Sequence, residues 1–395
     1  MNATVSSTTA STTAADAAFM DRALALAARG VALASPNPMV GAVLVRDGKI
    51  IGEGFHTYEG VLHAEIVALE SAVGTARGAT LYVNLEPCCH TGRTGPCTKA
   101  LIGAGVARVV AAMADPNPAV AGRGFKELRV AGIEVTTGLR EAEARRLNEP
   151  FARWIVSKTP LVTLKSALTL DGQLALPVAP GRARRKLQDR WITSEESRAE
   201  VQAMRHGSDA LLTGIGTVLA DDPLLTDRTG LPRRRNLLRV VMDSDLRLPP
   251  RSKLVRSADG DVLVFTRAKE DSPKAKALRR AGVEVVRLGG SRGAQPDLRA
   301  AIEELGRRGI LSVLLESGAT MNSAALAAEI VDKMRVFFAP KIAGFAVPEV
   351  AGKKLGKARA AAGMRSAQQL RNVTMAQFGS DFAVEGYLRD VYRTR

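Results

Sequence analysis

The chain has 395 residues, of which 46% are hydrophobic, 24% charged and 4% aromatic, a composition typical of a globular protein rather than a disordered or fibrous one. No stretch reaches the roughly 18 uninterrupted apolar residues that a membrane-spanning helix needs, so we expect no membrane association. The formal net charge of +16 favours anionic partners such as phosphates or nucleic acid. Two basic clusters, at 182–186 and 233–235, lack interleaved aromatic residues, and we interpret them as solvated loops.

The three cysteines all lie between Cys88 and Cys97. So few thiols, odd in number, cannot form a disulfide framework, and they indicate a reducing, cytoplasmic location and a metal-binding or catalytic role. The first residues are mostly Ser, Thr and Ala and match neither a secretory signal nor a transit peptide. We therefore expect residues 1–16 to form a disordered tail.

From residue 17 onward the sequence alternates helical and strand-like patterns, beginning with a helix that ends near Gly30. Two apolar-rich runs, 40–46 and 49–55, flank Asp47-Gly48, a pair suited to the positive φ angles of a two-residue hairpin turn. This half is then predicted to contain a helix at 63–72, a strand at 80–85, a helix at 98–102, a strand at 106–113, and a further helix and strand before Gly138. The order predicts a compact layered α/β domain.

The charge density rises over 140–158, and a strand-like segment opens at 161–170, so we place a domain boundary between residues 158 and 159. The predicted domains are therefore 17–158 and 159–395. Buried strands are predicted at 210–213, 238–243, 261–266, 283–288, 312–315 and 334–340, with helical stretches between several of them, as is typical of a mainly parallel sheet. Two further runs, 373–378 and 382–388, predict an antiparallel hairpin at one edge.

The most specific signal is His63-Ala64-Glu65 followed by Glu86-Pro87-Cys88 and then by Cys97. One His and two Cys make a zinc ligand set, and catalytic zinc sites keep a fourth position open to water. On a helix Glu65 lies about 200° around the axis from His63, so it is poorly placed as a co-ligand and can face that water instead. A carboxylate there can carry a proton from the water to a leaving amine, as in zinc nucleobase deaminases.

Other interpretations stay open. Cys89 could complete a four-ligand structural zinc site, although adjacent side chains diverge and Glu65 would then lack a role. The grouping could also be a coincidence of a helical His and buried thiols. A nucleic-acid-editing deaminase would use the same chemistry with the basic clusters as a strand groove, whereas a non-catalytic zinc-stabilised binding module would tolerate the loss of Glu65.

These residues resemble the bifunctional deaminase-reductase family of riboflavin biosynthesis. Besides the zinc motifs, the resemblance rests on Pro36-Asn37-Pro38-Met39-Val40-Gly41 and on Asp115-Pro116-Asn117-Pro118. It implies an α/β fold with an N-terminal cytidine-deaminase-like three-layer domain, in which His63, Cys88 and Cys97 bind Zn²⁺ and Glu65 shuttles the proton. It also implies that a phosphorylated pyrimidine is held by Asn37, His56, His90, Arg93 and Asn117, although Asn also suits turns and Arg93 could simply be solvated.

In the second half, Gly214-Ile215-Gly216-Thr217 is by itself weak evidence for a phosphate loop. The resemblance continues here through the segments at 165–172, 191–193, 216–223, 240–244 and 316–320. It implies a C-terminal dihydrofolate-reductase-like domain that uses NADPH. The implied substrate contacts are Arg205, Leu225, Arg228 and Glu316, and the implied cofactor contacts are Leu168, Trp191, Thr217, Asp221, Ser244, Gly318, Ala319 and Thr320.

Arginine suits a phosphate because its guanidinium binds one bidentately. Trp191 could instead be a core aromatic residue, Asp221 a cap and Ser244 a strand terminator. The sequence departs from the family pattern in two places. First, a basic insert spans 182–186, and Asp189 stands where the family has Ser; second, Ser317 replaces a Gly or Ala. The first puts one substrate contact in doubt, whereas Ser317 is small enough to preserve a close backbone approach.

The resemblance implies two consecutive reactions. The first is zinc-dependent hydrolytic deamination of diaminohydroxyphosphoribosylaminopyrimidine, and the second is NADPH-dependent reduction of its phosphoribosyl side chain to give 5-amino-6-(5-phosphoribitylamino)uracil. The expected partners are this small phosphorylated pyrimidine and further copies of the chain in a homo-oligomer, with neither nucleic acid nor membrane.

Overall fold

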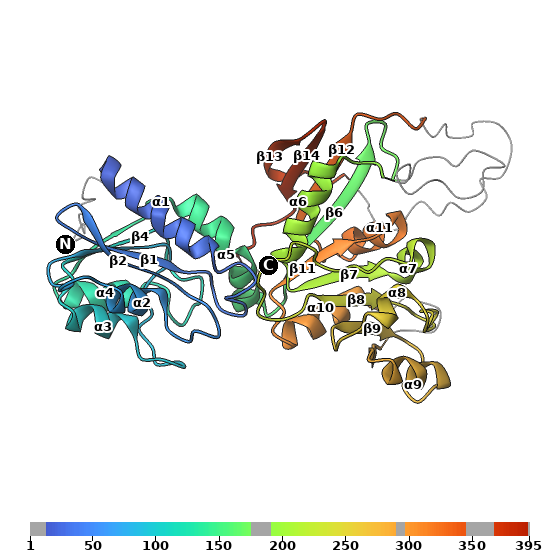
Figure 1. Ribbon diagram of the computed structural model, residues 1–395, viewed down its shortest axis with the longest axis horizontal. Coiled ribbons are helices and arrows are strands. Elements are labelled where there is room, and N and C mark those ends of the chain that lie inside the picture. Colours follow the sequence, from blue (N-terminus) through green and yellow to red (C-terminus); the bar gives the residue numbers. More distant parts are fainter. Residues whose placement is uncertain (1–12, 175–190, 290–296, 345–366, 394–395) are drawn as a thin grey trace, which may run out of the picture. The chain divides into compact units, whose positions relative to one another are not determined.

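Figure 1 shows the computed structural model of the chain, which describes residues 13–174, 191–289, 297–344 and 367–393. The basic segment 182–186 and Asp189 lie outside these residues. The chain divides into two compact units, the first comprising Met1–Ser157, Pro232–Arg234 and Tyr392–Arg395, and the second Lys158–Leu231 and Arg235–Val391. Within the described ranges, no helix has the length and apolar character needed to cross a bilayer.

The first unit is a three-layer α/β sandwich around a five-stranded sheet of order β2-β1-β3-β4-β5. The strands are β1 (Gly41–Arg46), β2 (Lys49–Phe55), β3 (Thr80–Val83), β4 (Arg108–Ala111) and β5 (Glu134–Thr137). β1 pairs antiparallel with β2 and β3, and the other pairs are parallel. The helices are α1 (Ala14–Ala28), α2 (Ala64–Glu70), α3 (Cys97–Gly103), α4 (Arg123–Val130) and α5 (Glu141–Ser157).

Alternate residues of each strand serve the two faces of this sheet. Leu44 packs with α2, α3 and α4 in one apolar cluster, whereas Val43 packs with α1 and α5 in the other. The predicted hairpin is confirmed, with Asp47 and Gly48 at φ values of 51° and 71°. The expected three-layer, cytidine-deaminase-like architecture is therefore present.

Two helices differ from the expectation. α1 begins at Ala14, inside the expected tail, because Thr13 and Asp16 form a capping box in which each side chain accepts from the other's backbone N–H. α5 was not predicted at all. Of the charged residues that suggested a boundary, Glu141, Glu143 and Arg146 are exposed, whereas Glu149 and Arg153 are buried in this 17-residue helix, which also contains Pro150.

α2 lies directly on β2 because two glycines face it. A Cβ at Gly52 would lie 2.2 Å from the carbonyl oxygen of Ala68, and one at Gly54 would lie 2.4 Å from that of Ala64. Any larger residue would push the helix off the strand. This close packing fixes the position of the helix that follows His63 and carries Glu65.

The second unit contains a nine-stranded sheet of order β10-β9-β8-β7-β11-β6-β12-β14-β13 in its described part. The strands are β6 (Leu161–Thr169), β7 (Ala210–Gly214), β8 (Leu238–Met242), β9 (Val262–Thr266), β10 (Glu284–Arg287), β11 (Ser312–Glu316), β12 (Lys333–Ala339), β13 (Arg371–Phe378) and β14 (Asp381–Tyr387). The helices are α6 (Glu195–His206), α7 (Ile215–Asp221), α8 (Lys253–Arg256), α9 (Pro273–Arg280), α10 (Leu298–Arg307) and α11 (Ala319–Ala327).

Pairing is parallel from β10 to β12 and antiparallel for β12-β14-β13. The prediction of a mainly parallel sheet closed by an edge hairpin is thus confirmed. Two large apolar clusters include residues of this sheet.

The basic cluster at 233–235 is not a set of solvated side chains. The Arg234 guanidinium lies 3.7 Å from the centre of the Tyr58 ring and 3.1 Å from a carboxylate oxygen of Glu59. Arg235 lies 3.1 Å from the Asp209 carboxylate. All three arginines of the cluster are half-buried, so the interpretation as solvated loops was wrong: Arg235 pairs with the buried Asp209, and Arg234 pairs with the exposed Glu59 and covers an aromatic face.

Candidate functional sites

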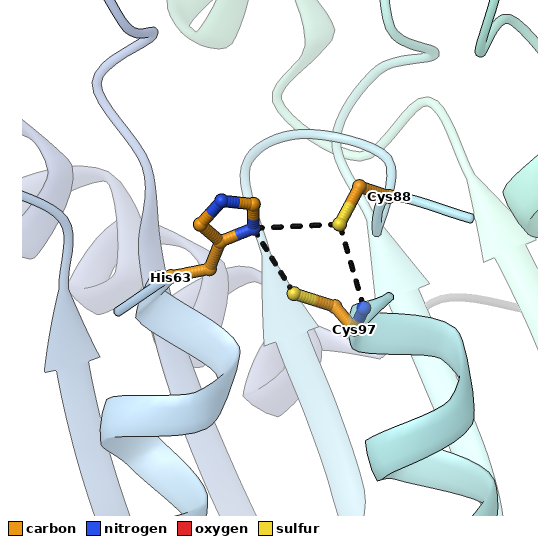
Figure 2. Close-up of side chains that lie close together, drawn as sticks. All are labelled: His63, Cys88 and Cys97. Carbon is orange, nitrogen blue, oxygen red and sulfur yellow. Dashed lines mark hydrogen bonds between the residues drawn. The ribbon is translucent and has the colours of Figure 1, made fainter. Parts of the chain in front are cut away.

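The first candidate site lies where two helices begin beside a loop. His63 precedes α2, Cys97 is the first residue of α3, and Cys88 follows β3. Figure 2 shows that the His63 Nδ1 points at both sulfurs, at 3.4 Å from Cys88 Sγ and 3.2 Å from Cys97 Sγ. The backbone N–H of Cys97 donates to Cys88 Sγ at 3.4 Å. All three ligand atoms lie within 4.8 Å of one another.

This geometry fits a zinc ion. Zn–S and Zn–N bonds of about 2.0–2.3 Å in a tetrahedral arrangement require ligand atoms at roughly these separations. The Cys97 thiol and His63 donate to Cys88 and lower the pKa of its thiol, whereas the same hydrogen bond and burial raise the pKa of Cys97. Cys88 therefore loses its proton more readily than Cys97, and both thiols must be deprotonated to bind a metal.

Cys89 lies outside this ligand group in the described part of the chain. Burial and the nearby Glu127 carboxylate raise the pKa of its thiol. A four-ligand structural zinc site that includes Cys89 is therefore not what the structure builds. Three ligands leave a position open, which is typical of catalytic zinc.

Glu65 is buried on α2, with 3% of its surface exposed. Burial raises the pKa of its carboxyl group to about 7, although the charge of His63 opposes the shift. A group with a pKa near neutrality can both accept and release a proton. Glu65 is thus suited to proton transfer beside the ligand group.

Glu86 has a role that the sequence did not reveal. Its carboxylate accepts hydrogen bonds from the backbone N–H groups of Asp115, Gly122 and Phe125 at 2.9–3.2 Å. These bonds hold the segment 115–125 against the loop after β3, which carries Cys88. The only sequence signal was a charged residue within the Glu-Pro-Cys motif.

Asn37 and His56 lie beside the zinc ligand group. The rings of His56 and His63 are 5.5 Å apart between centroids. His56 Nδ1 donates to the carbonyl of Leu62 at 2.8 Å, and Asn37 Nδ2 donates to His56 Nε2 at 2.9 Å. Burial lowers the pKa of His56, so its ring is neutral and orients Asn37.

The other three predicted pyrimidine contacts are placed differently from one another. Arg93 is not merely solvated, because its guanidinium lies 4.4 Å from the Tyr58 ring centre and donates to the Tyr58 carbonyl at 3.1 Å. His90 is exposed on the loop between Cys88 and Cys97. Asn117 Oδ1 accepts from Ala119 N at 3.1 Å, so this side chain serves its own turn.

The second candidate site is a cavity of about 300 Å³ in the second unit. It lies at the carboxyl ends of β7, β8 and β11, the edge where open α/β sheets bind ligands. Five of the predicted cofactor contacts line it, namely Thr217, Ser244, Gly318, Ala319 and Thr320. Nothing lies within 4 Å of a Cβ placed at Gly216 or Gly318, so an extended ligand can approach the backbone there.

Helix α11 begins in this cavity directly after Gly318, and its first N–H groups suit a phosphate. The cavity therefore offers a binding place for a phosphate group of a dinucleotide such as NADPH. Arg247, which the sequence analysis did not select, also lines it and adds positive charge. Leu168, Trp191 and Asp221 do not line it, and Trp191 is 49% exposed.

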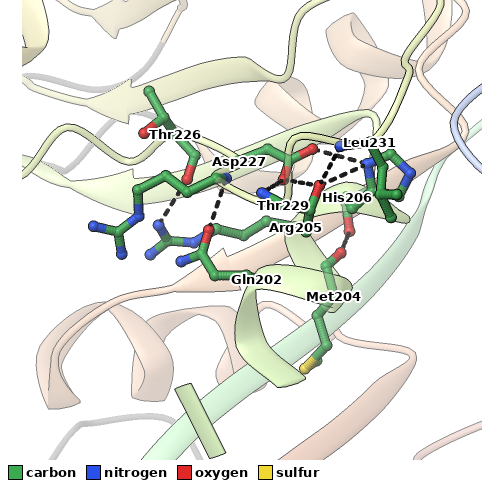
Figure 3. Close-up of polar contacts among 10 residues, drawn as sticks. Gln202, Met204, Arg205, His206, Thr226, Asp227, Thr229 and Leu231 are labelled. Carbon is green, nitrogen blue, oxygen red and sulfur yellow. Dashed lines mark hydrogen bonds and ion pairs between the residues drawn. The ribbon is translucent and has the colours of Figure 1, made fainter. Parts of the chain in front are cut away.

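The predicted substrate contacts of the second unit form a charged group. Arg205 donates two hydrogen bonds to the Glu316 carboxylate, at 2.7 and 2.9 Å. Its Nη1 also donates to the carbonyl of Thr226 at 3.1 Å, and both of these residues are labelled in Figure 3. Burial alone would raise the pKa of Glu316, but these bonds and the charges of Arg205, Lys165 and Arg228 lower it. Leu225, which directly precedes Thr226 in the chain, is buried and has a φ angle of 58°.

Lys165 also belongs to this group. It is the first residue of the segment 165–172, and the sequence alone assigned it no role. It lies on β6, which pairs Lys165 with Glu316 of β11. Burial lowers the pKa of its ammonium group, while the Glu316 charge opposes the shift. A lysine with a lowered pKa is a suitable proton donor, and only the parallel pairing of distant strands reveals it.

Comparisons with known proteins agree with both sites. Residues 13–113 match the cytidine and deoxycytidylate deaminase zinc-binding region, and residues 160–384 match the RibD C-terminal domain. The riboflavin biosynthesis protein RibD of Escherichia coli is 44% identical over 342 residues, which cover 83% of this chain and 89% of that protein. The RibD of a Synechocystis species is 40% identical over 374 residues, which cover 94% and 96%.

Among solved structures, Acinetobacter baumannii RibD superposes with a TM-score of 0.75 at 36% identity, covering 94% of this chain and 98% of that chain. A diaminohydroxyphosphoribosylaminopyrimidine deaminase/5-amino-6-(5-phosphoribosylamino)uracil reductase from Thermotoga maritima gives the same TM-score and the same coverage at 35% identity. The chain therefore belongs to the RibD family of riboflavin biosynthesis enzymes, which join a zinc-binding deaminase domain to an NADPH-using reductase domain.

Proposed function

We propose that the chain performs two consecutive reactions on one phosphorylated pyrimidine. The first is hydrolytic deamination of diaminohydroxyphosphoribosylaminopyrimidine, and the second is reduction of its phosphoribosyl group to give 5-amino-6-(5-phosphoribitylamino)uracil. The observation that carries the proposal is the presence, in one chain, of a three-ligand His/Cys group with a buried Glu65 and of a cavity at the strand ends whose lining residue Ser317 directly follows Glu316 of the charged group. The Thermotoga relative is named for both reactions.

In the deamination, His63, Cys88 and Cys97 would hold Zn²⁺, which when bound would supply a Lewis acid for the activation of water. Glu65 accepts a proton from the attacking water and delivers it to the departing ammonia. Neutral His56 and the Asn37 that it orients hold the pyrimidine. Arg93, stacked on Tyr58, suits the phosphate, whereas His90 and Asn117 are assigned contacts to the ribosyl group by resemblance alone.

In the reduction, NADPH supplies the hydride. Thr217, Ser244 and the turn Gly318-Ala319-Thr320 would hold NADPH in the cavity, and Leu168, Trp191 and Asp221 are assigned to the cofactor by resemblance alone. Lys165 holds the proton that the sugar ring oxygen takes up when the ring opens. Glu316 and Leu225 position the sugar, and Arg205 and Arg228 bind its phosphate.

The proposal also includes a cytoplasmic location and an assembly of identical chains. All three thiols are free, which agrees with a reducing compartment. The substrate is a small molecule rather than nucleic acid. The half-buried, paired arginines at 233–235 support this choice, because they offer no open basic groove.

The test measures ammonia release and NADPH oxidation by the zinc-loaded chain supplied with the diaminopyrimidine ribosyl phosphate. We expect Glu65→Gln to abolish ammonia release, and Glu70→Gln, at an exposed position of the same helix, to leave it unchanged. NADPH oxidation by Glu65→Gln should return when the deaminated pyrimidine is supplied. A wild-type chain that releases no ammonia would refute the first reaction, and one that oxidises no NADPH with the deaminated substrate would refute the second.

A further inference from the structure

The end of α6 is tied to the segment 226–231 by side-chain hydrogen bonds at successive residues (Figure 3). Besides the bond from Arg205 to the Thr226 carbonyl, His206 Nδ1 lies 2.9 Å from Asp227 Oδ2. The backbone N–H of Arg228 donates to the Gln202 side chain at 3.0 Å. Helix α6 therefore fixes the backbone of residues 226–228, which includes Arg228.

Asp227 is the centre of this arrangement. Its Oδ2 faces His206, and its Oδ1 accepts from both the backbone N–H and the hydroxyl of Thr229, at 3.0 and 2.8 Å. The side chains of His206 and Asp227 are each only 8% exposed. Buried hydrogen bonds to a charged group are strong and hold their geometry.

Asp227 carries a carboxylate directly beside Arg228 in the chain, and its contact with His206 determines where that carboxylate points. A carboxylate next to Arg228 in the chain could turn toward that guanidinium and compete with an incoming phosphate. The bonds to His206 and Thr229 hold the carboxylate instead against α6. His206 also follows Arg205 directly in the sequence, so one contact connects the backbones of both phosphate-binding arginines.

We propose that His206 and Asp227 are positioning residues that hold Arg205 and Arg228 in place for the phosphate of the reductase substrate. The inference rests on the proposed function, in which these arginines bind that phosphate. It adds a buried pair that touches neither substrate nor cofactor and acts only through its neighbours.

The experiment compares KM and kcat for the deaminated substrate with and without its phosphate, by NADPH oxidation. We expect His206→Ala to raise KM for the phosphorylated substrate by about 10- to 100-fold, because a misplacement of about 1 Å can cost up to about 100-fold. The KM for the dephosphorylated substrate, the KM for NADPH and kcat should stay within about twofold of wild type. His206→Asn, whose amide nitrogen can occupy the place of Nδ1, should restore the wild-type KM.

Asp332→Asn is the matched control, since Asp332 is fully buried, accepts from Val162 N at 2.9 Å and pairs with Arg389. It should lower Tm without changing KM. If His206→Ala fails to fold, His206→Gln displaces the donor by one methylene and should raise KM in the same way.

A KM that is unchanged, or that rises equally for both substrates, overturns the inference while the proposed function stands. A failure of His206→Asn to restore KM overturns it as well. A wild-type chain that shows no preference for the phosphorylated substrate refutes both the inference and the phosphate-binding roles on which it rests.

Discussion

Gly124 of α4 offers a direct test of how the fold supports the zinc ligands. A Cβ at this position would lie 2.1 Å from the carbonyl oxygen of Pro87 and 3.2 Å from a carboxylate oxygen of Glu86. Since real Cβ contacts essentially never fall below 3.0 Å, Gly124→Ala requires a displacement of about 0.9 Å. Pro87 immediately precedes Cys88, so the displacement reaches a zinc ligand.

Forcing one carbon into a packed site costs about 1–3 kcal/mol. Supporting contacts around a metal site typically change metal affinity by about 10- to 100-fold when they are altered. We therefore expect Gly124→Ala to raise the zinc dissociation constant by that factor, as measured by competition with a chromogenic chelator. Ammonia release at limiting zinc should fall in proportion.

Gly103→Ala is the matched control, because Gly103 lies in α3 and a Cβ there meets nothing within 4 Å. It should leave zinc affinity unchanged. NADPH oxidation with the deaminated substrate provides a second control within the same chain and should be unaffected by either variant. Wild-type zinc affinity in a folded Gly124→Ala variant would refute the link between α4 packing and the ligand group.

Three further predictions concern the two units separately. Burial by itself would raise the pKa of Asp16, but hydrogen bonds from Tyr82 and Thr13 and the Arg108 charge lower it from 3.8 to about 2. Asp16→Asn should therefore lower the free energy of unfolding by about 2 kcal/mol at pH 7. Because the folded-state pKa is lowered, this difference in unfolding free energy should persist above about pH 4 and vanish toward pH 2 in urea titrations; a pH-independent difference would contradict it. Lys165→Met should reduce the reductase kcat by roughly 100-fold or more, with NADPH binding retained in fluorescence titrations, and near-normal turnover would exclude Lys165 as the proton donor. Removal of zinc by a chelator should stop ammonia release but not NADPH oxidation with the deaminated substrate, and a parallel loss of both would show that the sites are not independent.

Features encoded by short stretches of sequence could be predicted. The Asp47-Gly48 turn and the zinc ligand set depend on local backbone preferences and on the chemistry of a few residue types, so both were visible in the sequence. The positions of the buried strands along the chain were also visible, although their order in the sheet was not, because parallel strands covered on both faces leave continuous apolar runs.

Features that depend on distant contacts could not be predicted. Glu86 acquires its role from amides 29–39 residues away, and Lys165 from the pairing of β6 with β11. α5 was missed because charged residues and Pro150 hide its buried side. The start of α1 is a milder case, since Thr13 and Asp16 did carry a capping pattern.

The first unit is not one continuous stretch of chain, since it includes Pro232–Arg234 and Tyr392–Arg395. Arg234 donates to the Ser35 carbonyl at 3.0 Å and covers the Tyr58 ring, and the Tyr392 hydroxyl donates to the Arg145 carbonyl at 2.6 Å. A gene split after residue 157 would therefore encode a deaminase fragment that lacks the Arg234 contacts to Ser35 and Tyr58 and the Tyr392 contact to Arg145. Separating the two activities into independent proteins would therefore require other residues to replace these contacts.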